Sequence, residues 1–149
     1  MIQSFLIGFV LPWIFGIWLY LKNPKVILTI APFMSVVAFT VNQWGYYFEF
    51  WDLVPILKDE TASAIPLNLG IYPVLSSLMI HLIQTKKSNP YLWIFILTIF
   101  TTFLELICLI LGKVVYHNGW NIFWTFVSYL IPYWLTYLYY KLLKHHDII

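Results

Sequence analysis

Long apolar runs recur along this chain of 149 residues, and only short polar turns separate them. Five runs reach about 18 residues or more, and a helix of that length crosses a bilayer core of about 30 Å. Hydrophobic residues make up 62% of the chain and charged residues 9%, whereas a soluble domain carries about 25% charged residues. The sequence therefore predicts a polytopic membrane protein and excludes both a soluble domain and a disordered chain.

We predict a single all-α transmembrane domain over residues 1–149, built as an integral membrane bundle of five transmembrane helices. The spans are expected at about residues 4–21, 26–47, 66–83, 91–111 and 121–140. The amino-terminal residues Met1-Ile2-Gln3-Ser4 lack the positive start of a secretory signal, so we expect the first run to be retained as a span.

The placement of lysines predicts the orientation of the bundle. Six of the eight basic residues fall in the first loop, the third loop and the tail: Lys22, Lys25, Lys86, Lys87, Lys141 and Lys144. Lys58 and Lys113 fall on the opposite side. Because short cytoplasmic loops collect lysine, we expect the amino terminus outside and the carboxyl terminus in the cytoplasm. The net charge of +2 is too small and dispersed for nucleic-acid binding.

A short interfacial or re-entrant helix is predicted in the outer loop between the second and third spans, within residues 48–65. The apolar side chains of this loop follow a helical spacing of i, i+3, i+4 and i+7: Phe50, Leu53, Val54 and Leu57. Glu49 and Asp52 would share a different face of that helix. The alternative is a loop whose apolar residues are incidental.

Glu105 is the first candidate for a functional residue. It lies within the apolar stretch from Leu97 to Leu111 and fourteen residues after Tyr91, roughly 21 Å along the span and so in its outer half. A carboxylate at that depth must be protonated, paired, metal-bound or placed in a wet cavity. The alternative is a neutral carboxyl group that merely hydrogen bonds to a neighbouring helix.

Other polar residues are expected at a similar height or just above it. These further candidates for ligand binding are Asn42, Tyr72, Asn68, Asn121, Glu49, Asp52 and His117. A polar pocket that opens outward from the outer half of the bundle is the simplest common explanation. The alternative is that the asparagines cap helices and that Asn118-Gly119 forms a turn.

Motifs for metal binding and nucleophilic catalysis are absent. The chain has no HExxH, no CxxC and a single cysteine, Cys108, so we expect no disulfide, metal or other cofactor. Glu49, Asp52, Glu105 and His117 are suitable ligand types, but their spacing is not that of a metal site. Acid–base chemistry by Glu105 and His117 is the catalysis most compatible with these residues, and the sequence leaves open whether the protein is an enzyme.

Several short motifs are shared with a known group of proteins. They are Trp51-Asp52-Leu53-Val54-Pro55, Leu67-Asn68-Leu69-Gly70-Ile71-Tyr72-Pro73, the isolated Glu105 and Tyr116-His117-Asn118-Gly119-Trp120-Asn121. With the length and spacing, they resemble an uncharacterised family of small multi-pass membrane proteins of Bacillus-like and clostridial bacteria. The resemblance covers most of the chain. It implies a location in the bacterial cytoplasmic membrane and carries no activity with it.

Three functions are compatible with this sequence. The leading hypothesis is binding of a small amphiphile or lipid, associated with transport, in an outward-facing polar pocket where Glu105 is a proton-sensitive anchor. The second is an enzyme acting on a lipid or isoprenoid at the outer leaflet through Glu105, Asp52 and His117. The third is a structural or partner-binding subunit. The expected partners are membrane lipids, a small amphiphilic ligand, and a second copy of the chain or another intramembrane protein.

Overall fold

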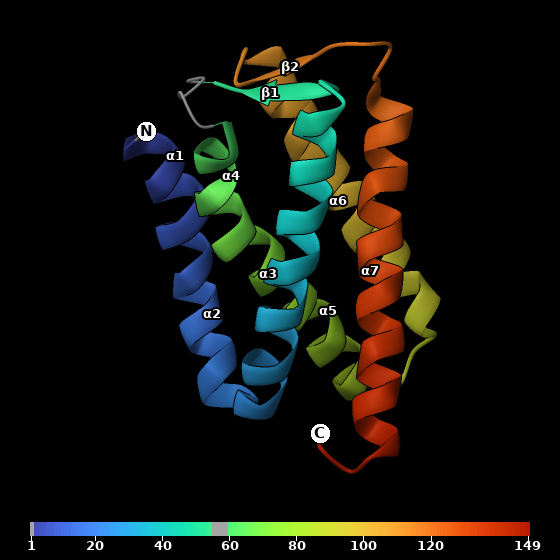
Figure 1. Cartoon of the computed structure of the whole chain (residues 1–149). Coiled ribbons are helices and arrows are strands. Elements are labelled where there is room, and N and C mark those ends of the chain that lie inside the picture. Colours follow the sequence, from blue (N-terminus) through green and yellow to red (C-terminus); the bar gives the residue numbers. More distant parts are fainter. Residues whose placement is uncertain (1, 55–59) are drawn as a thin grey trace.

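A computed structural model of the protein describes residues 2–54 and 60–149. The helices, in chain order, are α1 (Ile2–Phe5), the π-helical turn η1 (Leu6–Val10), α2 (Leu11–Lys22), α3 (Pro24–Tyr47), α4 (Glu60–Leu69), α5 (Ile71–Lys86), α6 (Pro90–Ile110) and α7 (Ile122–His145). Two short strands, β1 (Trp51–Leu53) and β2 (Val114–Tyr116), lie together at one end of the bundle (Figure 1). The predicted all-α class is confirmed.

Four stretches of helix are long and apolar enough to cross a membrane: Gln3–Lys22, Pro24–Tyr47, Thr61–Lys86 and Pro90–Ile110. They correspond to the first four predicted spans, although the third begins at Thr61 and not at residue 66. Helices of this kind are typical of a membrane protein. Helix α7 has 24 residues, as many as α3, but tyrosine, threonine and lysine make it less apolar, and a count of five spans is not confirmed.

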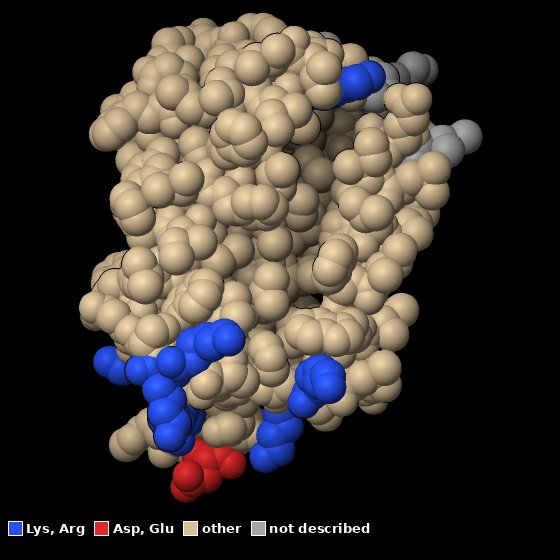
Figure 2. Space-filling model, turned by 180° about the vertical axis from the view of Figure 1, so that it is seen from behind, with Lys and Arg blue, Asp and Glu red and all other residues tan. Residues whose placement is uncertain are grey.

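The two ends of the bundle differ in charge. We call the end that carries β1 and β2 the sheet end. The opposite end, which we call the lysine end, carries the turn between α2 and α3 and the carboxyl ends of α5 and α7. Basic side chains gather at the lysine end, whereas the surface toward the sheet end is mostly uncharged in this view (Figure 2).

Proline and glycine shape the helices next to the sheet end. The amino-terminal helix widens into η1 just before Pro12, whose ring has no amide proton and crowds the carbonyl of Gly8. The amide of Leu11 bonds instead to the carbonyl of Leu6. A Cβ atom on Gly70, between α4 and α5, would lie 2.0 Å from the Gly8 carbonyl oxygen. The two backbones therefore touch, and this contact joins the amino-terminal helix to the α4–α5 bend.

The apolar core is concentrated toward the lysine end. There α3, α5, α6 and α7 bury a continuous cluster: Val26, Ile30, Met79, Ile80, Ile83, Ile94, Leu97, Tyr133, Tyr140 and Leu143. A smaller cluster of Tyr46, Trp51, Ala64 and Val114 lies beneath the strands. The half of the bundle next to the sheet end is therefore less completely filled by apolar side chains.

The helix predicted within residues 48–65 is wrong for the described part of the segment that follows Phe48, whereas the last residues of that range, from Glu60, begin α4. Trp51–Leu53 forms β1, which pairs antiparallel with β2 so that Trp51 lies opposite Tyr116. The amide of Val54 also donates to the Lys113 carbonyl at 2.9 Å. Residues whose amides find partners on a distant loop adopt a strand despite their helical spacing. Leu57 and Lys58, on which the predictions also relied, lie outside the described residues.

Candidate functional site

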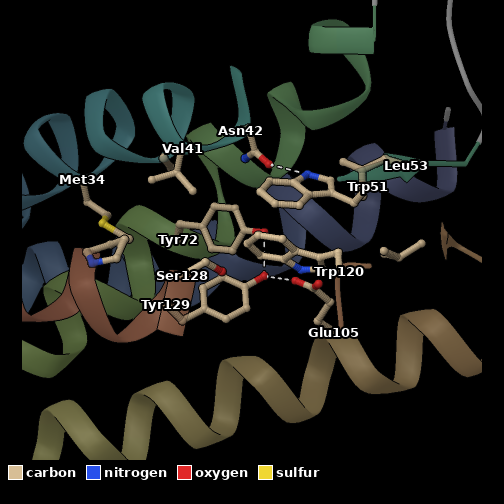
Figure 3. Close-up of a pocket in the computed structure, with 13 residues that line it drawn as sticks. Met34, Val41, Asn42, Trp51, Leu53, Tyr72, Glu105, Trp120, Ser128 and Tyr129 are labelled. Atoms are coloured by element: carbon tan, nitrogen blue, oxygen red, sulfur yellow. Dashed lines mark hydrogen bonds between the residues drawn. The ribbon is translucent and has the colours of Figure 1, made fainter. Parts of the chain in front are cut away.

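Glu105 lies near the sheet end of α6 and accepts hydrogen bonds from three hydroxyl groups. The Tyr116 hydroxyl donates to Oε1 at 2.6 Å. The Thr125 hydroxyl lies 3.2 Å from the same oxygen and 2.8 Å from the Tyr116 oxygen, so its one proton is shared between the two acceptors. The Tyr129 hydroxyl donates to Oε2 (Figure 3). The donors come from β2 and from the first two turns of α7, so the site forms only when these segments meet α6.

Hydrogen-bond directions in this cluster converge on the carboxylate. Because the Trp120 indole can only donate, Thr125 accepts its N–H at 2.9 Å. The Tyr72 and Tyr129 hydroxyl oxygens are 3.1 Å apart. Since Tyr129 donates to Glu105, the remaining proton is that of Tyr72, and Tyr129 accepts it. Indole and hydroxyl protons thus point toward a single acidic group, and these bonds favour a negative charge there while burial opposes it.

The Tyr116 hydroxyl is a secure donor to Glu105. Burial, and next the nearby Glu105 carboxylate, raise the pKa of the Tyr116 phenol above its ordinary value. The phenol is therefore protonated at physiological pH.

Glu105 has no basic partner in the described part of the chain. The ion pair found there joins His117 Nε2 to Asp52 Oδ2 at 3.0 Å, on the exposed side of the strands. An acid within an apolar span is stable when it holds a proton, a counter-charge or strong hydrogen bonds. Glu105 has the hydrogen bonds, and no basic side chain among the described residues provides a counter-charge.

A cavity of about 40 Å³ adjoins the carboxylate, and Glu105, Asn42 and Tyr72 all line it. Trp51 and Trp120 cover it, with ring centroids 4.8 Å apart. Phe50 stacks on Trp120 at 4.9 Å, and we call these three residues the aromatic lid. A volume of 40 Å³ is far below the several hundred Å³ of ordinary small-molecule pockets. In this structure the space beside Glu105 is therefore too small for an ordinary small-molecule ligand.

Trp51 of the aromatic lid is fixed by a glycine and by two asparagines. A Cβ atom on Gly45 would lie 2.0 Å from the Trp51 ring, so the indole occupies the space that a side chain would take. Its N–H donates to Asn42 Oδ1 at 3.3 Å, and Asn42 Nδ2 donates to Asn68 Oδ1 at 2.6 Å. Asn68 lies behind Asn42, fully buried, and does not line the cavity.

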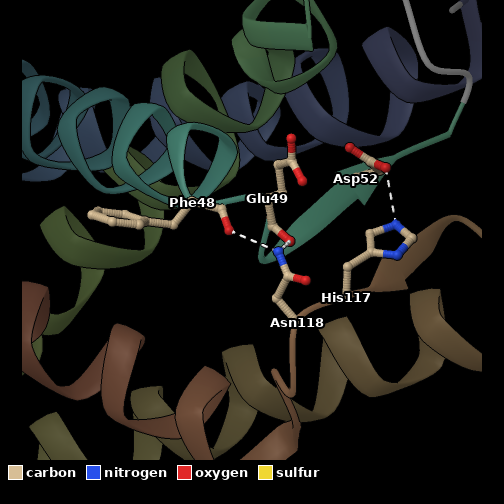
Figure 4. A network of polar contacts seen from close by, with 5 residues as sticks. All are labelled: Phe48, Glu49, Asp52, His117 and Asn118. Carbon is tan, nitrogen blue, oxygen red and sulfur yellow. Dashed lines mark hydrogen bonds and ion pairs between the residues drawn. The ribbon is translucent and has the colours of Figure 1, made fainter.

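The turns beside the aromatic lid are held by side chains from the loop after β2. Asn118 Nδ2 donates to the carbonyls of Phe48 and Glu49 at 3.1 and 3.2 Å (Figure 4). His117 pairs with Asp52 across the two strands. Glu49 contributes its carbonyl to this network, and its carboxylate points away from Asn118 (Figure 4).

The structure thus divides the predicted site residues into separate groups. Glu105, Asn42 and Tyr72 share one cavity. The exposed Asn121 is the amino-terminal cap of α7, where it accepts from Phe123 N at 3.0 Å. Asp52 and His117 do not line the cavity, so the three groups invoked for an enzyme are not brought onto one surface.

Sequence reasoning missed the residues that complete the site: Tyr116, Thr125, Tyr129, Trp51 and Trp120. Thr125 and Tyr129 are four residues apart and share a helix face, which could have drawn attention to them. The positions of Tyr116 and the two tryptophans depend on pairing between distant loops, and no local pattern indicates it. Among the described residues, no group of three or more His, Cys, Asp or Glu could hold a metal ion.

The fold and the site define a helical membrane protein with an acid-anchored, aromatic-covered cavity near one end of its bundle. Comparison of the chain with protein-family models, with curated proteins and with solved structures finds no match. The functional argument therefore rests on the geometry of this site.

Proposed function

We propose that the protein is a five-span protein of the bacterial cytoplasmic membrane that binds a small amphiphile under the aromatic lid, with Glu105 as the anchor. The observation that carries the proposal is the carboxylate itself. It combines three hydroxyl donors, no basic partner in the described chain and direct contact with a cavity.

The chemistry of the cavity favours a ligand with an amine head group. Three donors occupy three of about four acceptor positions on a carboxylate, which leaves room for one more. A protonated amine would fill that position and supply the missing positive charge. The faces of Trp51, Trp120 and Tyr72 add a favourable surface for a cation. An anionic head group would meet repulsion from Glu105.

Helix α7 is the fifth span in this proposal. Its 24 residues extend roughly 36 Å, enough to cross the hydrocarbon core. Its polar side chains Thr125 and Thr136 are buried against the other helices, with at most 1% of their surface exposed. The lysine end then lies in the cytoplasm and the sheet end outside.

Binding requires the aromatic lid to move, because a cavity of about 40 Å³ accepts only water-sized groups. The lid residues belong to β1, the turn before it and the loop after β2, not to a span. They can therefore shift without breaking a transmembrane helix. Such an opening would admit the ligand from the outer side, as a transport-associated binding protein requires.

The test uses the gently extracted protein and native mass spectrometry. Wild type and Glu105→Gln are compared for co-purified ligands and metals, and then for binding of octylamine, octanol and octanoate, which differ only in the head group. Thr101→Val, one helical turn away on α6, is the matched control. A thermal unfolding curve for each variant checks folding.

We expect wild type and Thr101→Val to bind octylamine in preference to octanol and octanoate. Glu105→Gln should lose that preference by tenfold or more, about the loss of one hydrogen bond to a charged group. Equal binding of octylamine by wild type and folded Glu105→Gln would overturn the proposal. If Glu105 only joins helices through hydrogen bonds, Glu105→Gln should unfold at a lower temperature than wild type and bind octylamine equally well.

A further inference from the structure

A second recess lies at the lysine end, between the carboxyl ends of α5 and α7 and the start of α6. It is open to the surroundings and has a volume of about 870 Å³. Its polar lining includes Lys87 from the end of α5 and Lys141, Lys144 and His145 from the end of α7. Basic groups from two helices that are distant in sequence thus surround one space.

The three lysines of this recess form no ion pair in the part of the chain that the structure describes. Lys141 Nζ lies 6.0 Å from the centroid of the Tyr137 ring. Asp147 is the acidic side chain that accompanies them at this end of the molecule. Like charges around a shared space repel one another, and a bound anion removes that repulsion.

The lining of the recess also includes apolar side chains. Ile83 and Tyr140 line it and also belong to the main core, with 8% and 6% of their surfaces exposed. Ile149 forms another part of the lining and packs against the same core. A space lined by both basic and apolar groups matches a phosphate joined to hydrocarbon better than a free inorganic ion.

We infer that this recess binds the head group of an anionic phospholipid from the leaflet at the lysine end, with Lys87, Lys141 and Lys144 around the phosphate. Basic pockets between transmembrane helices on the cytoplasmic side hold such head groups by the same attraction. The site is separate from the amphiphile site, since it uses other residues at the other end of the bundle. It does not depend on the function proposed for Glu105.

The chain offers a matched control for this inference. The triple variant Lys87→Gln/Lys141→Gln/Lys144→Gln removes the three lysines of the recess. The triple variant Lys22→Gln/Lys25→Gln/Lys86→Gln removes three lysines from the same end that do not line it. Both lose the same charge, so a diffuse attraction to anionic lipid changes equally in the two.

The experiment measures binding of phosphatidylglycerol against phosphatidylcholine to each detergent-solubilised protein by native mass spectrometry. In wild type and in the control triple we expect retained phosphatidylglycerol and a preference that differs by less than about twofold. In the recess triple the preference should fall by about tenfold or more. An equal fall in both triples, or no fall in the recess triple, would overturn the inference.

Competition with inorganic phosphate distinguishes a lipid site from a site for a free anion. We expect millimolar phosphate to leave most of the phosphatidylglycerol bound at constant ionic strength, because it cannot use the apolar walls. Complete displacement by phosphate, with chloride as the control, would assign the recess to a free anion instead. Thermal unfolding of both triples establishes that the variants compared are folded.

Discussion

Helices α6 and α7 meet at two neighbouring levels that use similar residues differently. At one level the hydroxyls of Thr101 and Tyr133 are 2.7 Å apart, both side chains are almost fully buried and neither lines the cavity. One turn toward the sheet end, Tyr129 donates instead to Glu105, and a cavity adjoins the pair.

The difference between the two levels is the charge that each can hold. The Tyr133 hydroxyl donates to Thr101, and the Thr101 hydroxyl donates to the Leu97 carbonyl, so both neutral groups have partners within the helices and the helices close around them. A carboxylate has more acceptor positions than its neighbours fill, and it attracts a counter-charge that the described residues do not provide. The first level therefore serves packing, and the second is suited to binding.

The largest expected effect comes from filling the space under Trp51. Gly45→Ala puts a methyl group where the indole now lies, and such overpacking costs about 1–3 kcal/mol. We expect a lower unfolding temperature and greater quenching of tryptophan fluorescence by acrylamide. A Trp51→Ala background should abolish the extra cost of Gly45→Ala, and a cost that persists there would show that the glycine serves another purpose.

Glu105→Asp distinguishes the effect of the negative charge at residue 105 from the effect of the position of its carboxylate. The variant keeps the negative charge but withdraws the carboxylate by one methylene from Tyr116, Thr125 and Tyr129. We expect octylamine binding to weaken by about 2 kcal/mol, roughly thirtyfold, measured by native mass spectrometry. Thr101→Ser removes a methyl group beside the Thr101–Tyr133 contact and should bind octylamine as wild type does. If Glu105→Asp binds normally, charge alone determines recognition.

Removing one hydroxyl at each level tests the comparison directly. Tyr129→Phe should weaken octylamine binding by about 1.5 kcal/mol, because it removes a donor to a charged group. Tyr133→Phe should lower the free energy of unfolding by about 1 kcal/mol and leave binding unchanged. A loss of octylamine binding in Tyr133→Phe but not in Tyr129→Phe would contradict this distinction between the two levels.

The smallest effect is expected at the exposed ion pair across the strands. Asp52→Asn should change the free energy of unfolding by less than about 1 kcal/mol, since solvent-exposed ion pairs contribute little. Octylamine affinity should stay within about twofold of wild type. A large loss of affinity would show that the Asp52–His117 pair holds the aromatic lid in place.

Some parts of the fold and site could be predicted because their cause is local. The apolar runs locate α3 and α6 within a few residues, since a membrane-spanning helix needs only length and hydropathy. Glu105 stands out because an acid within an apolar run is costly wherever the helix packs. Asn42 and Tyr72 were predicted to lie near its height, and they share its cavity.

Other parts could not be predicted because their cause lies far away in the chain. The helical spacing after Phe48 gave a wrong prediction for Trp51–Leu53, because β1 is specified by its pairing with β2, more than sixty residues later. Asn121 has the residue type of a ligand-binding group, yet its local bonds to the amides of Phe123 and Trp124 account for it.

The sequence by itself determined the class of the protein, the positions of the apolar helices and the presence of an acid within one of them. Hydropathy and helical rise are additive along the chain, so they can be read without knowing which helices meet. Only the tertiary structure decided which hydroxyls reach Glu105, that Trp51 and Trp120 cover its cavity, and that lysines of α5 and α7 share a recess. These arrangements depend on distances between segments remote in sequence, and packing alone sets those distances.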